Sequence, residues 1–127
     1  MSAKFPDKRA RCAKVIFFKA HAGKSQEYGD YLRATVEPID RRAAGDGALL
    51  DMLTLVNNSV NDHDPSQPWT HLRIFLFDSE AQRAGINPVC ARIAAELQPD
   101  ESVLKARKTY GEGLRALVAE LDVGVLG

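Results

Sequence analysis

The sequence predicts an α+β fold in which helices cover one face of a single antiparallel sheet. Three apolar runs rich in β-branched and aromatic residues, at 13–21, 48–56 and 69–77, predict strands. Apolar residues repeat at steps of three and four over 25–43 and again over 79–121, and this spacing predicts helices. The resulting order of strand, helix, strand, strand, helices and strand is typical of a two-layer sandwich.

The first helix is expected to begin at Ser25, which can act as its N-cap. Pro38 lies inside the apolar pattern and cannot donate an intrahelical hydrogen bond, so a kink or an early end is expected near Glu37. The loop at 57–68 is rich in Asn, Asp, Ser and Pro and predicts a turn between the second and third strands. Those two strands therefore form an antiparallel hairpin.

The helical region after the third strand restarts at Asn87 and reaches Leu97. Asp100 can cap a further helix, whose apolar period continues to Leu121, and residues 122–126 are expected to form a short last strand. The whole order predicts the split βαβ, or ferredoxin-like, arrangement. In this arrangement the first and third strands lie side by side, antiparallel, at the centre of a four-stranded sheet.

The size and composition indicate one domain at 13–127, preceded by a flexible basic arm at 1–12. The 17 basic residues balance the 17 acidic residues, which argues against nucleic acid or an anionic membrane as a partner. The two cysteines form no CxxC motif, so we expect no disulfide framework, no metal site and a reducing, cytoplasmic environment. No apolar run approaches the ~20 residues that cross a bilayer.

The third strand carries the most informative pattern in the chain. Its alternation places aliphatic residues on one face and mixes aromatic with cationic or ionisable residues on the other. We expect the aliphatic face, with Leu72, Ile74 and Leu76, to pack under the helices. The opposite face then presents Trp69, His71, Arg73 and Phe75 to a partly polar cavity.

The first strand is expected to contribute to the same cavity, because Ile16, Phe18 and Ala20 point to the helices and the intervening residues point away. The antiparallel pairing brings the end of the first strand close to the start of the third. The predicted catalytic residues are His71, Arg73 and His21. The predicted substrate-binding residues are Phe17, Lys19, Asp51, Trp69 and Phe75.

Two interpretations of this cluster remain open. A His can take a proton while Arg73 or Lys19 stabilises an anion, which is the chemistry of a small-molecule enzyme. The same residue types are common in subunit interfaces, where the cluster would have no catalytic role. Asp51 is expected to pair with Arg73, either as a structural salt bridge or as a catalytic base.

The chain also resembles the dimeric α/β-barrel superfamily, which includes small antibiotic-biosynthesis monooxygenases, EthD-like proteins and stress-responsive A/B-barrel proteins. The resemblance spans about 14–126 and is carried by segments 15–19, 23–24, 27–39 and 69–81. It implies a homodimer, with the open sheet faces of two subunits packed into a barrel. It also implies cofactor-independent, monooxygenase- or cyclase-like chemistry on an aromatic or polyketide-like substrate. The alternative is a non-catalytic small-ligand-binding or assembly protein.

Overall fold

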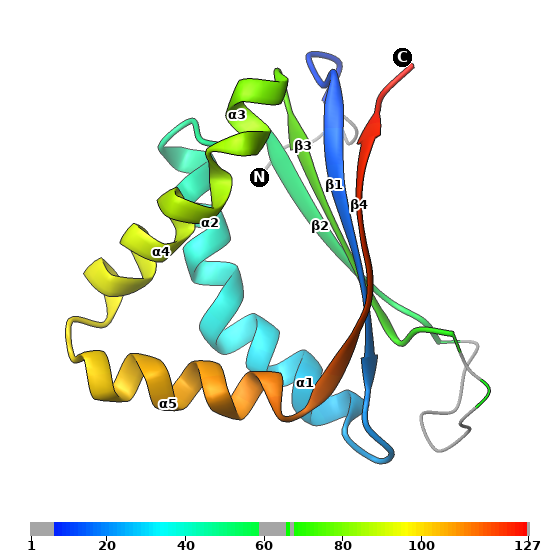
Figure 1. Cartoon of the computed structure of the whole chain (residues 1–127), viewed down its shortest axis with the longest axis vertical. Helices are drawn as coiled ribbons and strands as arrows, with labels where there is room; N and C mark the ends of the chain where they lie inside the picture. The colour runs from blue at the N-terminus through cyan, green and yellow to red at the C-terminus, as the bar shows by residue number, and fades with distance from the viewer. Residues whose placement is uncertain (1–6, 59–65, 67, 127) are drawn as a thin grey trace.

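The computed structural model describes residues 7–58, 66 and 68–126. It contains one four-stranded sheet whose strands are β1 (Cys12–Ala20), β2 (Asp51–Val56), β3 (His71–Phe77) and β4 (Arg115–Gly124). The strand order is β2-β3-β1-β4, and each strand is antiparallel to its neighbours. The central pairing of β1 with β3 confirms the α+β class and is compatible with a ferredoxin-like fold. The sheet is open, with edges at β2 and β4 (Figure 1).

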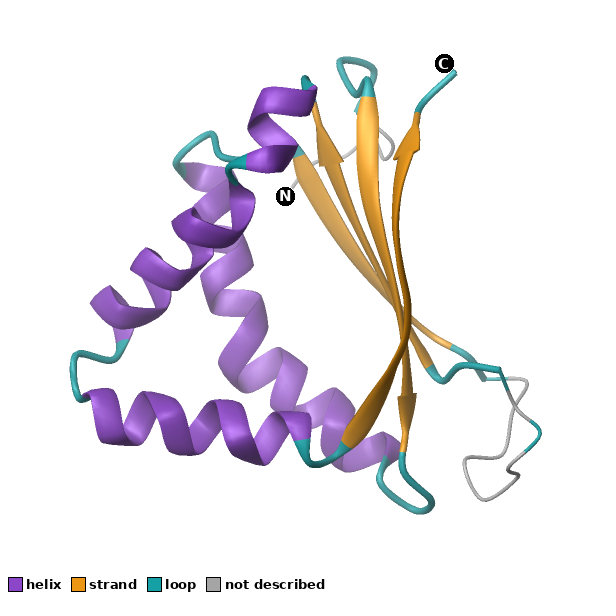
Figure 2. Ribbon diagram, viewed as in Figure 1, coloured by secondary structure: helices purple, strands orange, loops and turns teal. Residues whose placement is uncertain are grey.

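All the helices that the described residues form lie on one face of the sheet, and the other face has no helix over it (Figure 2). The helix layer begins with one continuous helix, which consists of α1 (Ser25–Tyr31), the π-helical segment η1 (Leu32–Val36) and α2 (Glu37–Gly45). The N–H of Glu37 bonds to the carbonyl of Leu32, five residues back. The wider turn comes just before Pro38, where the ring would otherwise crowd a carbonyl of the preceding turn. The distortion predicted at Glu37 is therefore present.

The second half of the helix layer consists of α3 (Glu80–Ala84), α4 (Ile86–Leu97) and α5 (Glu101–Glu112). Asp100 caps α5 as predicted, because its Oδ1 accepts hydrogen bonds from the N–H groups of Ser102 and Val103. Helix α4 runs away from the sheet, and α5 returns to it (Figure 1). No helix in the described ranges is long and apolar enough to span a membrane.

The prediction that the last helix continues to Leu121 was wrong, because β4 begins at Arg115. The segment pairs with β1 over nearly its whole length, with Val15 opposite Leu121. Gly113 follows the last residue of α5 and ends the helix. Without β4, one edge of the central strand β1 would lack backbone partners.

The predicted N-terminal arm and the predicted loop between the second and third strands lie only partly within the described residues. Of the expected arm at 1–12, residues 1–6 lie outside the described part. Residues 7–10 form a turn in which Ala10 is buried, and the N–H of Arg11 donates to the carbonyl of Phe77. Cys12 already belongs to β1, so the predicted arm extends one residue too far. Most of the predicted loop at 57–68 also lies outside the described residues.

Candidate functional site

A cavity of about 450 Å³ lies between the helix-covered face of the sheet and the helices. Its volume falls within the range of small-molecule sites, about 300–1,000 Å³. The wall is mostly apolar and comes from β1, β3, α1, η1, α2, α4 and α5. The apolar lining comprises Ile16, Val36, Ile39, Phe75, Ile86, Ala91, Ala94 and Leu104. The polar lining comprises Lys14, Tyr31, Thr35, Asp40, Arg73, Asn87, Cys90, Arg107 and Lys108.

A buried ion pair between Arg73 on β3 and Asp40 on α2 forms part of the cavity wall. Asp40 is 4% exposed and Arg73 6% exposed. Arg73 donates to Asp40 through Nη2 and to Thr54 Oγ1 through Nε, and its Cζ lies 4.8 Å from the centre of the Phe75 ring. Burial raises the pKa of the Asp40 carboxyl, and the positive charge of Arg73 opposes that shift.

The prediction of which face of β3 packs under the helices was wrong, because the two faces are exchanged. Ile16 pairs with Arg73 and Phe18 pairs with His71, and directly opposite residues share a face of the sheet. His71, Arg73 and Phe75 therefore lie under the helices, and the aliphatic residues of β3 occupy the open face. The predicted orientation of β1 is confirmed, since Ile16 and Phe18 pack in the helix-side clusters. A polar residue can occupy the buried face here because Asp40 and Thr54 supply partners.

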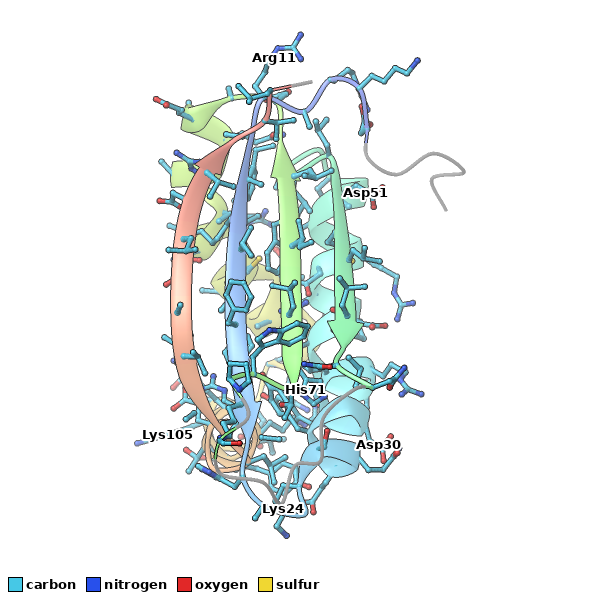
Figure 3. The ribbon with its side chains drawn as sticks, turned by 90° about the vertical axis from the view of Figure 1, so that its right-hand side faces the viewer. Arg11, Lys24, Asp30, Asp51, His71 and Lys105 are labelled. Carbon is cyan, nitrogen blue, oxygen red and sulfur yellow. The ribbon has the colours of Figure 1, made fainter. Side chains whose placement is uncertain are left out.

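His71 lies under α1, away from the cavity lining. It is 0% exposed, and its Nδ1 is 2.8 Å from Thr70 Oγ1. Its ring packs nearly perpendicular to the ring of Tyr28, with ring centres 4.9 Å apart and an interplanar angle of 84°. These contacts place His71 among the packed side chains of the lower end of the sheet (Figure 3).

The other predicted site residues are divided between the two faces of the sheet. Only Arg73 and Phe75 line the cavity. Phe17 and Trp69 pack edge to face on the open side, with ring centres 5.9 Å apart. The remaining predicted residues are also away from the cavity: they are Lys19 and Asp51, which alternate onto the open face, and the exposed His21 after β1.

The expected pairing of Asp51 with Arg73 was wrong, because the two residues lie on opposite faces. Asp51 is adjacent to Met52, whose side chain packs in the helix-side core. The carboxylate of Asp51 instead accepts a hydrogen bond from the N–H of Met52. Figure 3 shows Asp51 near the upper end of β2, on the edge of the sheet.

Sequence reasoning missed Asp40, although a signal for it was present. Asp40 lies four residues after Val36, on the helix face that the apolar pattern identifies as buried. A charged residue on such a face requires a partner of opposite charge. Lys14 gives a similar signal, because it alternates with Ile16 and so points to the helix side. It lies 3.4 Å from both Glu120 and Asp122.

Cys90 presents a thiol to the cavity from α4. It is partly buried, and burial raises its pKa to about 11, with a further contribution from the negative charge of Asp40. A thiol with this pKa is almost entirely protonated at neutral pH. Cys90 therefore presents a neutral thiol to the cavity.

Helix α5 is attached at its C-terminal end by close contacts with α1. Gly111 packs directly against the ring of Tyr31, and a Cβ at this position would overlap the ring. The hydroxyl of Tyr110 donates a hydrogen bond to Glu27 on α1, and this bond lowers the pKa of the Glu27 carboxyl. These contacts fix the end of the helix that contributes Arg107 and Lys108 to the cavity.

Comparison of the chain with family models, curated proteins and solved structures finds no match.

Proposed function

We propose that this protein binds a small, mostly apolar molecule in the cavity between its sheet and its helices. The observation that carries the proposal is the cavity itself, which combines an apolar wall with a few convergent polar groups. The predicted location of the ligand moves accordingly from the open face of the sheet to the helix side. Two of the predicted residues line this cavity: Arg73, which was predicted to be catalytic, and Phe75, which was predicted to bind the substrate.

Filling the cavity tests this proposal. Ala94 lines the cavity from α4, and Ala95 is exposed on the same helix outside the lining. Octan-1-ol serves as a neutral probe, and its binding is measured by calorimetry and by saturation-transfer NMR. We expect Ala94→Trp to abolish binding and Ala95→Trp to preserve it. Absence of octan-1-ol binding to the unmodified protein, or equal binding by both variants, would contradict the proposal.

The buried ion pair supports a second candidate function, which is enzymatic proton abstraction without a cofactor. A carboxylate whose pKa is raised by burial is a stronger base than an exposed one. Asp40 would take the proton next to the carbonyl of an aromatic ketone, and Arg73 would stabilise the enolate oxygen. The enolate is the intermediate from which a cyclase-like reaction begins. Reprotonation from water then regenerates the ketone.

Deuterium exchange tests the enzymatic candidate. In deuterated water, the protein should accelerate exchange of the protons next to the carbonyl of 1-tetralone, measured by proton NMR. Asp40→Asn should abolish the acceleration, and Asp40→Glu should retain part of it. A rate equal to that of buffer alone, or an unchanged rate in Asp40→Asn, would leave only the binding function.

We further propose that two copies associate through their open sheet faces, as the resemblance to dimeric α/β barrels implies. The open face carries aliphatic and aromatic side chains from all four strands, and no helix covers it (Figure 3). Exposed apolar area of this kind marks an interaction surface. Lys19 and Asp51 carry opposite charges and lie at opposite ends of the face. A two-fold axis that runs perpendicular to the strands would therefore bring Lys19 of one copy toward Asp51 of the other.

A matched pair of variants tests the association. Leu121 on the open face is 48% exposed, and Leu97 on α4 is 49% exposed. We expect light scattering to give twice the mass of 14.0 kDa for the unmodified protein and for Leu97→Asp. Leu121→Asp should give the monomer mass. A monomeric unmodified protein at high concentration would refute the dimer.

A further inference from the structure

We infer that the ligand of this cavity is an organic anion, whose acidic group lies at Arg107 and Lys108 and whose apolar body extends toward Phe75. This inference rests on the proposed binding function and adds the chemical class and the orientation of the ligand. It follows from the distribution of charge around the cavity.

The cavity is lined by four basic side chains and by a single acidic side chain, Asp40. Two of the basic side chains are neutralised locally. Arg73 is paired with Asp40, and Lys14 is paired with Glu120 and Asp122 on β4. An added anion therefore gains little from either of them, because a carboxylate already occupies the neighbourhood of each.

The remaining two basic side chains lie on one face of α5. Leu104, Arg107 and Lys108 follow the helical spacing of three and four residues, and all three line the cavity. The described residues supply no ion-pair partner for Arg107. Lys108 has only a loose contact with Glu112, at 3.9 Å and with both side chains exposed. The α5 side of the cavity is consequently the side with uncompensated positive charge.

The positions of these groups determine the orientation of the ligand. Arg107 and Lys108 are exposed, so an acidic group beside them stays in contact with water and avoids the cost of burial. The inner wall contains Ile16, Val36 and Phe75, which favour a hydrocarbon or aromatic body. An amphipathic acid satisfies both requirements. A cationic ligand would meet repulsion from the same two side chains.

Three probes with the same eight-carbon tail test the inference: octanoate, octan-1-ol and octylammonium. Exposed ion pairs are individually weak, so two of them predict that octanoate binds about three- to tenfold more tightly than octan-1-ol at low salt. Octylammonium should bind more weakly than octan-1-ol. The preference for octanoate should largely disappear at 1 M NaCl, where the screening length is about 3 Å.

Variants of α5 locate the acidic group. The double variant Arg107→Gln/Lys108→Gln should lose the preference for octanoate, measured as the ratio of its affinities for octanoate and octan-1-ol. Lys105→Gln is the matched control, because Lys105 projects outward from the same helix and does not line the cavity (Figure 3). Melting temperatures of the variants verify that each one is folded.

The outcomes separate this inference from the function on which it rests. If octan-1-ol and octanoate bind equally well, the cavity binds ligands but the anion preference is overturned. A preference that survives in Arg107→Gln/Lys108→Gln, or that is lost in Lys105→Gln, also overturns the inference. If no probe binds the unmodified protein, the binding function and the inference both fail.

Discussion

The ion pair between Asp40 and Arg73 makes the stability of the protein sensitive to changes at either residue. Asp40→Asn leaves the Arg73 guanidinium buried without a counter-charge, which typically costs about 3–5 kcal/mol of unfolding free energy. Replacing the pair together, as Asp40→Leu/Arg73→Met, removes both charges and should recover most of that loss. Urea unfolding of the three proteins measures the effect. A loss below about 1 kcal/mol in Asp40→Asn would indicate that water reaches Arg73.

Cys90 provides a chemical probe of the same cavity. With a pKa of about 11, against an ordinary value of 9.0, its thiolate fraction near pH 8 is lowered by about two orders of magnitude. Alkylation by iodoacetamide should therefore be far slower than for N-acetylcysteine and should accelerate as the pH rises toward 11. Saturating octan-1-ol should slow it further. Mass spectrometry of peptides separates Cys90 from the buried Cys12, and labelling of Cys90 at the free-thiol rate would contradict the burial.

The orientation of β3 shows what the sequence of a strand leaves open. Both faces of His71–Phe77 carry large apolar residues, so hydrophobic alternation alone does not distinguish the helix side from the open side. The choice depends on partners far away in the chain. Arg73 lies on the helix side because α2 supplies Asp40, 33 positions earlier. When both faces of a strand are apolar, its orientation can be predicted only if its partners elsewhere in the chain are known.

Helix α5 depends on a glycine for its position. Alanine at Gly111 would overlap the Tyr31 ring, so α5 must shift or the ring must leave its stack with Tyr28. We expect Gly111→Ala to lower the unfolding free energy by about 1–3 kcal/mol. It should also weaken octan-1-ol binding, because Leu104, which lines the cavity, moves with the helix.

Gly45→Ala is the control for that substitution. Gly45 also lies at the end of a helix, but a Cβ there meets no atom within 4 Å. Its replacement should be neutral or stabilise the protein by up to about 1 kcal/mol. Equal effects of the two substitutions would show that α5 does not pack tightly against Tyr31.

The last two elements show how one pattern can fit both kinds of secondary structure. Leu114, Leu117 and Leu121 match the helical period, but Ala119, Leu121 and Val123 also alternate as in a strand. The second pattern prevails because β1 has a free edge and because Gly113 ends α5. The prediction that Asp100 caps α5 is confirmed. The prediction that Ser25 caps the first helix was wrong, because Ser25 is the first residue of α1, and Lys24 holds the N-cap position without a side-chain capping hydrogen bond.

The whole architecture was more predictable than the site that it contains. The order of elements follows from runs of local sequence, and the split βαβ connection leaves few ways to arrange them. The cavity depends instead on how far α4 and α5 lie from the sheet. Its polar residues come from seven separate elements, and of the whole lining only Arg73 and Phe75 were identified from sequence.

Association of two copies would make stability depend on protein concentration. Folding coupled to dimerisation follows mass action, so the urea midpoint should rise as the concentration rises. Leu121→Asp should show a lower midpoint that does not change with concentration, and Leu97→Asp should behave like the unmodified protein. Circular dichroism over a hundredfold range of concentration measures this. A constant midpoint in the unmodified protein would mean that each copy folds alone.

The π-helical segment before Pro38 determines which side chains of α2 point toward the sheet. One residue of an α-helix corresponds to a rotation of about 100°, so a chain shortened by one residue within Leu32–Val36 would turn Asp40 away from β3. Arg73 would then lose its counter-charge and keep only the hydrogen bond to Thr54. A single-residue insertion or deletion between two regular helical stretches is thus enough to create or erase the charged base of the pocket, with no substitution at either charged residue.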